Sequence, residues 1–185
     1  NTKEFISWAR TQPKGVTYAS AGIGAPHHLA MEMFQALTQA KMVHIPYKGA
    51  GQFVPAMLSG EVETVIGAIN SLIPHVKAGK LRALAMSGNP NPLLPGIPSL
   101  RTEVPGYELD NWTGILAPAN TPAPIIRRLN TEFVRVLKLP DTAEKLEPQG
   151  IEIIGSTPEF YMDALKSYLS RSVKLVRDAG IKIEQ

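Results

Sequence analysis

Short apolar runs alternate with segments of helical periodicity along the first half of this 185-residue chain. Residues 16–20 (VTYAS) are β-branched and aromatic, which predicts a strand. Residues 26–40 place Leu29, Met33 and Leu37 on one stripe, which predicts an amphipathic helix. The alternation continues with strands at 42–47, 63–67 and 81–86, a helix that begins near residue 53, and a helix at 71–77 closed by Gly79. This βαβαβαβ order predicts an α/β fold, with a parallel sheet covered by helices on both faces.

A proline-rich stretch from Gly88 to Gly106 holds five prolines and marks a candidate domain boundary. The residues that follow, 107–117, are expected to be extended and to cross from one domain to another. Beyond them the pattern predicts helices at 122–138 and 141–146, a strand at 151–154, and a last helix with Thr157 as N-cap, Pro158 at its first position and Gly180 after its end.

Composition excludes several classes of protein. A hydrophobic content of 44% is too high for a disordered chain, and no apolar run approaches the roughly 18 residues of a membrane span. The absence of cysteine excludes disulfide scaffolds, thiolate zinc sites and cysteine nucleophiles. The net charge of +3 is mild and the basic residues are scattered, so no nucleic-acid partner is expected.

The segment that joins the first predicted strand to its helix, SAGIGAPHH from Ser20 to His28, has the features of an anion site. Gly22 and Gly24 let the backbone approach a ligand closely. The helix that follows offers unpaired N–H groups and the positive end of its dipole. The Ser20 hydroxyl lies nearby, and we expect the His28 side chain to pack beside the turn or to hydrogen-bond to it. The alternative is a tight strand-to-helix turn that needs glycine only for packing, because such a turn has the same sequence pattern.

Two more turns of this kind follow. The second strand leads into Lys48, Gly49 and Ala50, and the third ends before Asn70 and Ser71, which are placed to cap the next helix. Because parallel strands end at one edge of a sheet, the three turns are predicted to converge there, where ligands bind in open α/β sheets. With Lys48 the single nearby cation, carboxylates fit better than di- or triphosphates.

Other chemistries find less support in the sequence. The half-fingerprint Gly22-x-Gly24 has His27 where a dinucleotide site needs its third glycine, and no phosphate-binding loop or serine elbow is present. His27, His28, Glu32 and His44 match no recognised metal-ligand spacing. We therefore predict no catalytic residues, no metal and no cofactor. An α/β enzyme that binds a phosphorylated or nucleotide substrate at the same turns is the alternative.

Five strings, in order, carry a family resemblance: TYASAGIGAPHHLAMEMF, HIPYKGAG, LSGEVE, PHVKAGKLRALAM and VPGYELDNWTGILAPANTPAPIIRRLN. They resemble the substrate-binding proteins of tripartite tricarboxylate transporters, the Bug or TctC family, over nearly the whole chain. The resemblance implies a periplasmic binding protein of type II, with two α/β domains that close on a small carboxylate. It also implies a periplasmic location, membrane transporter subunits as partners and no enzymatic activity.

The resemblance also assigns parts of the chain to roles. Residues 13–106 would be the family's ligand-binding second domain, 107–185 a crossing strand with the C-terminal portion of the first domain, and 1–12 a helix leading in. The carboxylate loop would contain Ser20, Gly22, Gly24 and Ala25, and its neighbour Tyr47, Lys48, Gly49 and Ala50. With His28 and Asn70, these form the predicted ligand site.

Three departures from the family pattern bear on this prediction. Ala25 stands where many relatives have Ser or Thr, and Gly67 with Ala68 replaces a stretch that often carries Asp. Nothing in the chain matches the relatives' first hundred or so residues. The family's first domain, of which residues 107–185 would supply only the C-terminal portion, is therefore expected to be an incomplete α/β domain beside the intact one. We hypothesise that residues 111–185 dock on the intact domain or pair with another copy, as a homo-oligomer or swapped dimer.

Overall fold

The computed structural model describes residues 1–109, 112–178 and 180–181 of the chain. It divides into two compact units, one formed by Asn1–Asn111 with Ser172–Gln185 and the other by Trp112–Arg171. The assignment of residues 13–106 and 107–185 to two family domains remains a prediction.

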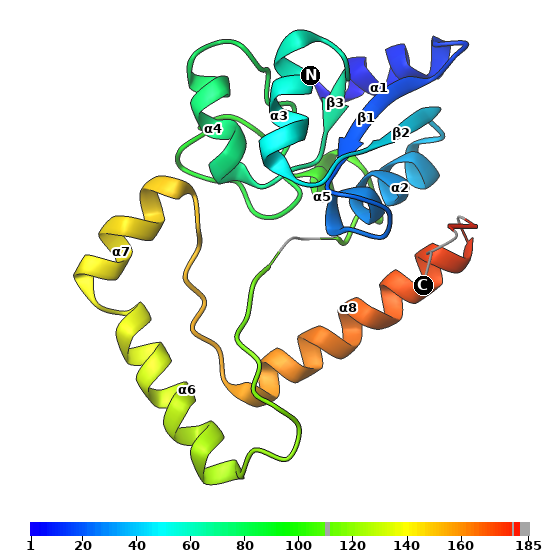
Figure 1. Ribbon diagram of the computed structural model, residues 1–185. Coiled ribbons are helices and arrows are strands. Elements are labelled where there is room, and N and C mark those ends of the chain that lie inside the picture. Colours follow the sequence, from blue (N-terminus) through cyan, green and yellow to red (C-terminus); the bar gives the residue numbers. More distant parts are fainter. Residues whose placement is uncertain (110–111, 179, 182–185) are drawn as a thin grey trace. The chain divides into compact units, whose positions relative to one another are not determined.

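The first unit contains a parallel three-stranded sheet with the strand order β2-β1-β3 (Figure 1). Every strand is followed by a helix, as the periodicity of the sequence predicts. In chain order the elements of this unit are α1 (Thr2–Thr11), β1 (Val16–Ser20), α2 (Pro26–Thr38), β2 (Met42–Pro46), α3 (Ala50–Ser59), β3 (Thr64–Val65), α4 (Ile69–Lys77) and α5 (Leu100–Glu103).

The two faces of the sheet are covered by different helices, because successive residues of a strand point to opposite sides. On one face Tyr18 lies in register with His44, and its hydroxyl reaches Glu32 of α2. On the other face Ala19, in register with Ile45, belongs to a core cluster around Phe53 of α3. This arrangement confirms the predicted α/β fold with helices on both faces.

The second unit contains helices α6 (Ala123–Leu137) and α7 (Pro140–Leu146), the 3-10 turn η1 (Glu147–Gln149) and most of α8 (Pro158–Asp178). Thr157 caps α8 as predicted, because its hydroxyl oxygen accepts the N–H of Phe160 at 3.2 Å. The Trp112 ring packs edge-on against Tyr161 and against a second tyrosine of α8, so it serves as a packing anchor within this unit.

Two predicted strands are absent from the described residues. Residues 81–86 form no strand, and only Met86 makes an isolated bridge, to Ser99. Residues 151–154 form no strand either. A strand needs a paired neighbour for its backbone groups, and neither segment has one: β3 is only two residues long, and residues 112–171 contain no strand. These predictions were wrong because apolar alternation indicates a strand without identifying its partner.

The segment predicted to be extended, 107–117, includes residues 110 and 111, which lie outside the described part of the chain. Its described residues form neither helix nor strand, and Ile115 and Leu116 are exposed. Among the described residues, no helix combines the length and the apolar character that crossing a bilayer requires.

Candidate functional site

Three strand-to-helix turns lie at the carboxyl edge of the parallel sheet, ahead of α2, α3 and α4. The first two turns are neighbours, because Tyr47 donates its N–H to the carbonyl oxygen of Ser20 at 3.0 Å. A Cβ placed on Gly22 would lie 3.8 Å from the carbonyl oxygen of Tyr47. The sheet thus brings the two predicted carboxylate loops together, as the order of its strands requires.

The first turn is held by hydrogen bonds among its own residues. The buried Ser20 hydroxyl oxygen accepts the N–H of Gly22 at 3.0 Å, and the N–H of Ala25 reaches the carbonyl of Gly22. Gly22 and Gly24 have φ values of 124° and 76°, which favour glycine. Ala25 is the N-cap of α2 and has no side chain to cap it. The N–H of Ile23 donates to no other residue in the described chain.

The second turn presents the start of α3. Gly49 is the N-cap, with φ 138° and ψ 179°, a conformation that is essentially restricted to glycine. Lys48 is exposed, and its backbone N–H donates to the side-chain oxygen of Gln52. The N–H groups of Gly49 and Ala50 remain available, since neither donates to a turn or side-chain acceptor within the described residues. Lys48 therefore adds a formal positive charge beside free backbone donors.

The third turn differs from the sequence prediction. The N-cap of α4 is Ala68, which provides no side-chain cap, whereas Asn70 lies within the first turn of the helix and is exposed. The Ser71 hydroxyl donates to the carbonyl of Ala68 at 2.8 Å. The expectation that Asn70 and Ser71 cap this helix was wrong, because the helix begins at Ile69, earlier than its apolar periodicity indicated.

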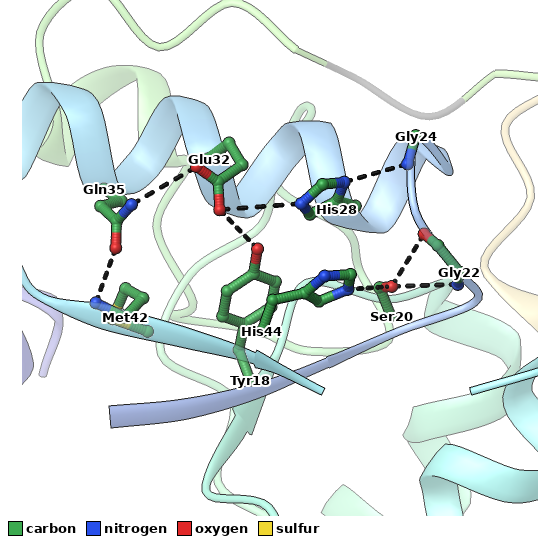
Figure 2. A network of polar contacts seen from close by, with 9 residues as sticks. All are labelled: Tyr18, Ser20, Gly22, Gly24, His28, Glu32, Gln35, Met42 and His44. Carbon is green, nitrogen blue, oxygen red and sulfur yellow. Dashed lines mark hydrogen bonds and ion pairs between the residues drawn. The ribbon is translucent and has the colours of Figure 1, made fainter. Parts of the chain in front are cut away.

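A network of polar side chains lies behind the first turn, between β1, β2 and α2 (Figure 2). His28 accepts the N–H of Gly24 on its Nδ1 atom at 3.0 Å, which confirms the expectation that this side chain bonds to the turn. Its ring stacks on that of His44, with centroids 4.0 Å apart and planes 11° apart. The Nε2 atom of His44 lies 2.6 Å from the Ser20 hydroxyl oxygen.

Glu32 is the acceptor at the other end of this network. Its Oε1 atom accepts the Tyr18 hydroxyl at 2.6 Å and lies 3.8 Å from His28 Nε2. Gln35 donates to Glu32 and accepts the N–H of Met42 at 2.6 Å, which ties α2 to the start of β2. Each of the side chains of Tyr18, Ser20, His28, Glu32, Gln35 and His44 thus has a polar partner in this layer, as burial between helix and sheet favours.

Burial sets the protonation states in the network. Burial first, and the neighbouring His28 second, together lower the pKa of His44 to about 4. Burial also lowers the pKa of His28, against an opposing effect of Glu32. The pKa of Tyr18 is raised, first by burial and then by its hydrogen bond to Glu32. Both imidazoles and the phenol are therefore neutral at pH 7.

Sequence reasoning did not identify this network. The bond from His28 to the turn was expected, but Glu32 and His44 were weighed as metal ligands that match no recognised spacing. Within residues 1–109, 112–178 and 180–181 no three metal-binding side chains gather. The i, i+4 spacing of His28 and Glu32 was a usable signal, because it places both on one helix face. The contribution of His44 depends on the register of β2 against β1, which the sequence does not state.

The geometry of the turns suits an anion. Their free donors are backbone N–H groups at the starts of α2 and α3, where the helix dipoles add positive potential. The Ser20 hydroxyl oxygen lies 2.6 Å from His44 Nε2, and it also bonds to the backbone N–H and the carbonyl of Gly22. Glu61 accepts a hydrogen bond from Tyr47, and Glu63 bonds to Thr17. The arrangement can hold a small acid.

Comparison with known families identifies the chain. A family model described as the tripartite tricarboxylate transporter family receptor, TctC, matches residues 1–181. The chain belongs to this family. The fold and the resemblance seen in the sequence are both confirmed by this match.

Individual relatives of the chain support the same family assignment. A UPF0065 protein from the tcbD-tcbE intergenic region of Pseudomonas sp. strain P51 is 31% identical over 98% of this chain and 55% of its own length. A solved structure, R. palustris Rpa4515 with adipate, has a TM-score of 0.86 at 30% identity and covers 98% of this chain and 61% of that one. MatC from Rhodopseudomonas palustris with bound malate has a TM-score of 0.78 at 25% identity, covering 95% and 62%. The chain thus spans little more than half the length of the curated relative.

Proposed function

We propose that this chain captures a small carboxylate for a tripartite tricarboxylate-type transporter and performs no chemistry on it. The observation that carries the proposal is the pairing of the first two turns, which places the starts of α2 and α3 at one edge of the sheet. Ile23, Gly49 and Ala50 supply N–H donors there, with Lys48 beside them. Ser20, Gly22, Gly24 and Ala25 shape the first loop, and Tyr47 the second.

The expected affinity follows from the number of donors. A hydrogen bond to a charged acceptor contributes about 1.5–3 kcal/mol, so three or four of them contribute up to about 12 kcal/mol. Less a cost of at least about 4 kcal/mol for immobilising the ligand, the expected Kd is about 1 μM at its tightest. That strength suits a receptor that must also release its ligand. Two relatives of similar fold were solved with adipate and with malate, both of which are dicarboxylates. This supports a dicarboxylate as the ligand class. Two solved structures of similar fold, described as a periplasmic transporter and as the periplasmic binding protein BugD, support the periplasm as the location.

Isothermal titration calorimetry of the 185-residue chain tests the proposal. We expect at least one of adipate, malate and citrate to bind with a Kd of about 1–100 μM, and ATP to give no saturable heat. ATP is the matched control, since it carries more charge than the turns can neutralise. Saturable binding of ATP with no response to any carboxylate would instead favour an enzyme with a nucleotide substrate.

The second unit leads us to propose an association between copies of this chain. The outer stripe of α6 contains Ile125, Leu129, Phe133 and Val136, whose exposed fractions are 41–50%. These residues recur at helical spacing and form one apolar face, which solvent disfavours. We expect light scattering after size-exclusion chromatography to give twice the 20.1 kDa mass of one chain, and Leu129→Glu to restore the monomer. A strict monomer at all concentrations would contradict the pairing.

A further inference from the structure

The hydrogen bonds within the turn at residues 20–25 join Ser20 to Gly22 and Gly22 to Ala25, and none of these involves the N–H of Gly24. The turn contains two glycines with positive φ, and the N-cap of the helix that follows is Ala25, which makes no side-chain hydrogen bond. Glycine is the residue type that loses most conformational freedom when it is ordered. The Gly24 N–H, which no bond within the turn holds, therefore depends on a contact from outside the turn for its orientation.

His28 provides that contact from the first turn of α2. Its Nδ1 atom lies 3.0 Å from the Gly24 nitrogen, and a backbone nitrogen can only donate, so Nδ1 is the acceptor. The proton of the neutral ring is therefore on Nε2, which faces Glu32 Oε1 at 3.8 Å. The bond resembles half of a capping box, in which a side chain in the first helical turn accepts an N–H from before the helix.

The orientation of the His28 ring is fixed from the other side by His44. The two rings stack 4.0 Å apart, and Tyr18 stacks on His44 with centroids 4.9 Å apart. His44 also reaches the Ser20 hydroxyl at the opposite end of the turn, at 2.6 Å. The His28 side chain is only 7% exposed, so its ring is held in this position and keeps the partners drawn in Figure 2.

We propose that His28 is a positioning residue of the carboxylate site, and that its neutral imidazole holds the 20–25 turn in its binding conformation by accepting the N–H of Gly24. The inference rests on the proposed function. It assigns His28 a place behind the turn, where it orients the donors and does not touch the ligand. Neither the Gly24 N–H nor the His28 Nδ1 is then available to the ligand.

The proposal has a consequence at acid pH. Protonation adds a hydrogen to Nδ1, which would then face the Gly24 N–H, and two donors cannot form a hydrogen bond. The side chains that face the imidazole are Glu32 from α2, Tyr18 from β1 and His44 from β2. Gln35 and Ser20 lie one contact further away, on Glu32 and on His44. Of these only Glu32 favours the charged ring, and it already accepts from Tyr18 and Gln35.

The direction of the pH effect follows from the pKa of His28, which burial lowers below its ordinary value of 6.5. The unfolded chain binds this proton at a higher pH than the folded chain does. The contribution of the neutral ring is therefore complete above the unfolded pKa and is lost as the pH falls through the folded one. The turn should loosen on acidification, below pH 6.5.

Two variants of His28 separate its role in the turn from simple packing. His28→Ala removes the acceptor, whereas His28→Asn can place an amide oxygen near the position of Nδ1 but cannot titrate. Amide hydrogen exchange by NMR, without ligand, should show Gly24 protected in the wild type, unprotected in His28→Ala and protected again in His28→Asn. Titration with adipate should show about fivefold weaker binding in His28→Ala and recovery of most of that loss in His28→Asn.

The pH profile supplies the second readout. Between about pH 7.5 and about pH 5, the range in which imidazoles titrate, the wild type should lose adipate affinity more steeply than His28→Asn. Protonation of adipate itself affects both proteins equally, so the difference belongs to His28. His75→Ala, which removes a histidine of α4 remote from the turn, is the control and should follow the wild-type profile.

The outcomes distinguish this inference from the proposed function. Equal protection of Gly24 in the wild type and in His28→Ala, or coincident pH profiles for the wild type and His28→Asn, would overturn the role of His28 while leaving carboxylate binding intact. If the wild type binds no carboxylate, the proposed function fails and the site has no ligand to position. The Gly24 exchange measurement would then still decide whether His28 holds the turn.

Discussion

Replacing Phe53 with alanine should lower the free energy of unfolding of the sheet-containing unit by about 3–5 kcal/mol. The Phe53 side chain is fully buried in the cluster that α3 forms against β1, with Ala19, Val54 and Val62. Its ring also packs edge-on against His27, at the start of α2. Truncation leaves a cavity that the neighbouring side chains cannot fill. A loss of this size is a large part of the total stability of a domain.

Urea denaturation followed by circular dichroism would measure the loss. Leu58→Ala is the matched control, because it truncates an apolar side chain of the same helix that is 38% exposed. We expect the control to lose less than about half as much, since much of its apolar area already lies in water. Equal losses in the two variants would show that α3 does not pack on the sheet through Phe53.

Gly49→Ala should weaken carboxylate binding by about tenfold or more. At φ 138° and ψ 179°, Gly49 has a conformation that an L-residue adopts only at a cost of about 1–3 kcal/mol. A Cβ at this position would meet no other atom within 4 Å, so the strain is confined to the backbone. The turn is expected to relieve it by rotating, and the N–H groups of Gly49 and Ala50 would then leave the site.

Gly60→Ala is the control for this prediction. Gly60 is at the opposite end of α3, also has a positive φ, and has equally open space around its Cβ position. It should therefore reduce stability by a similar amount and leave the affinity unchanged. Calorimetry with adipate on both variants makes the comparison. Similar affinities for Gly49→Ala and the wild type would exclude the second turn from the site.

Local periodicity determined most of the helices and the first two strands. Residues 16–20 are identical in prediction and structure, and α2 and α6 end within two residues of their predicted limits. The reason is that each of these elements has a complete apolar pattern and is preceded by glycine or proline. The placement of the two glycine turns at one sheet edge was also predictable, because it follows from parallel pairing alone.

The sequence did not indicate which segments pair with one another as strands. Residues 81–86 and 151–154 have the alternation of strands but no neighbouring backbone to bond with, and β3 is reduced to two residues for the same reason. Asn70 is a good capping residue by type, yet α4 begins before it. The pairing of a strand depends on which other segment lies beside it, and the capping of a helix depends on where that helix begins. Local composition specifies neither.

The sequence by itself determined that glycine turns precede three helices and that His28 is close enough to bond to the first of them. Only the tertiary structure decided that His44 stacks on His28 and reaches Ser20. The physical reason is register: the pairing of Val16 with Met42 places His44 beside Tyr18 on the face covered by α2. A shift of one residue would point His44 to the opposite face and leave the turn without this support.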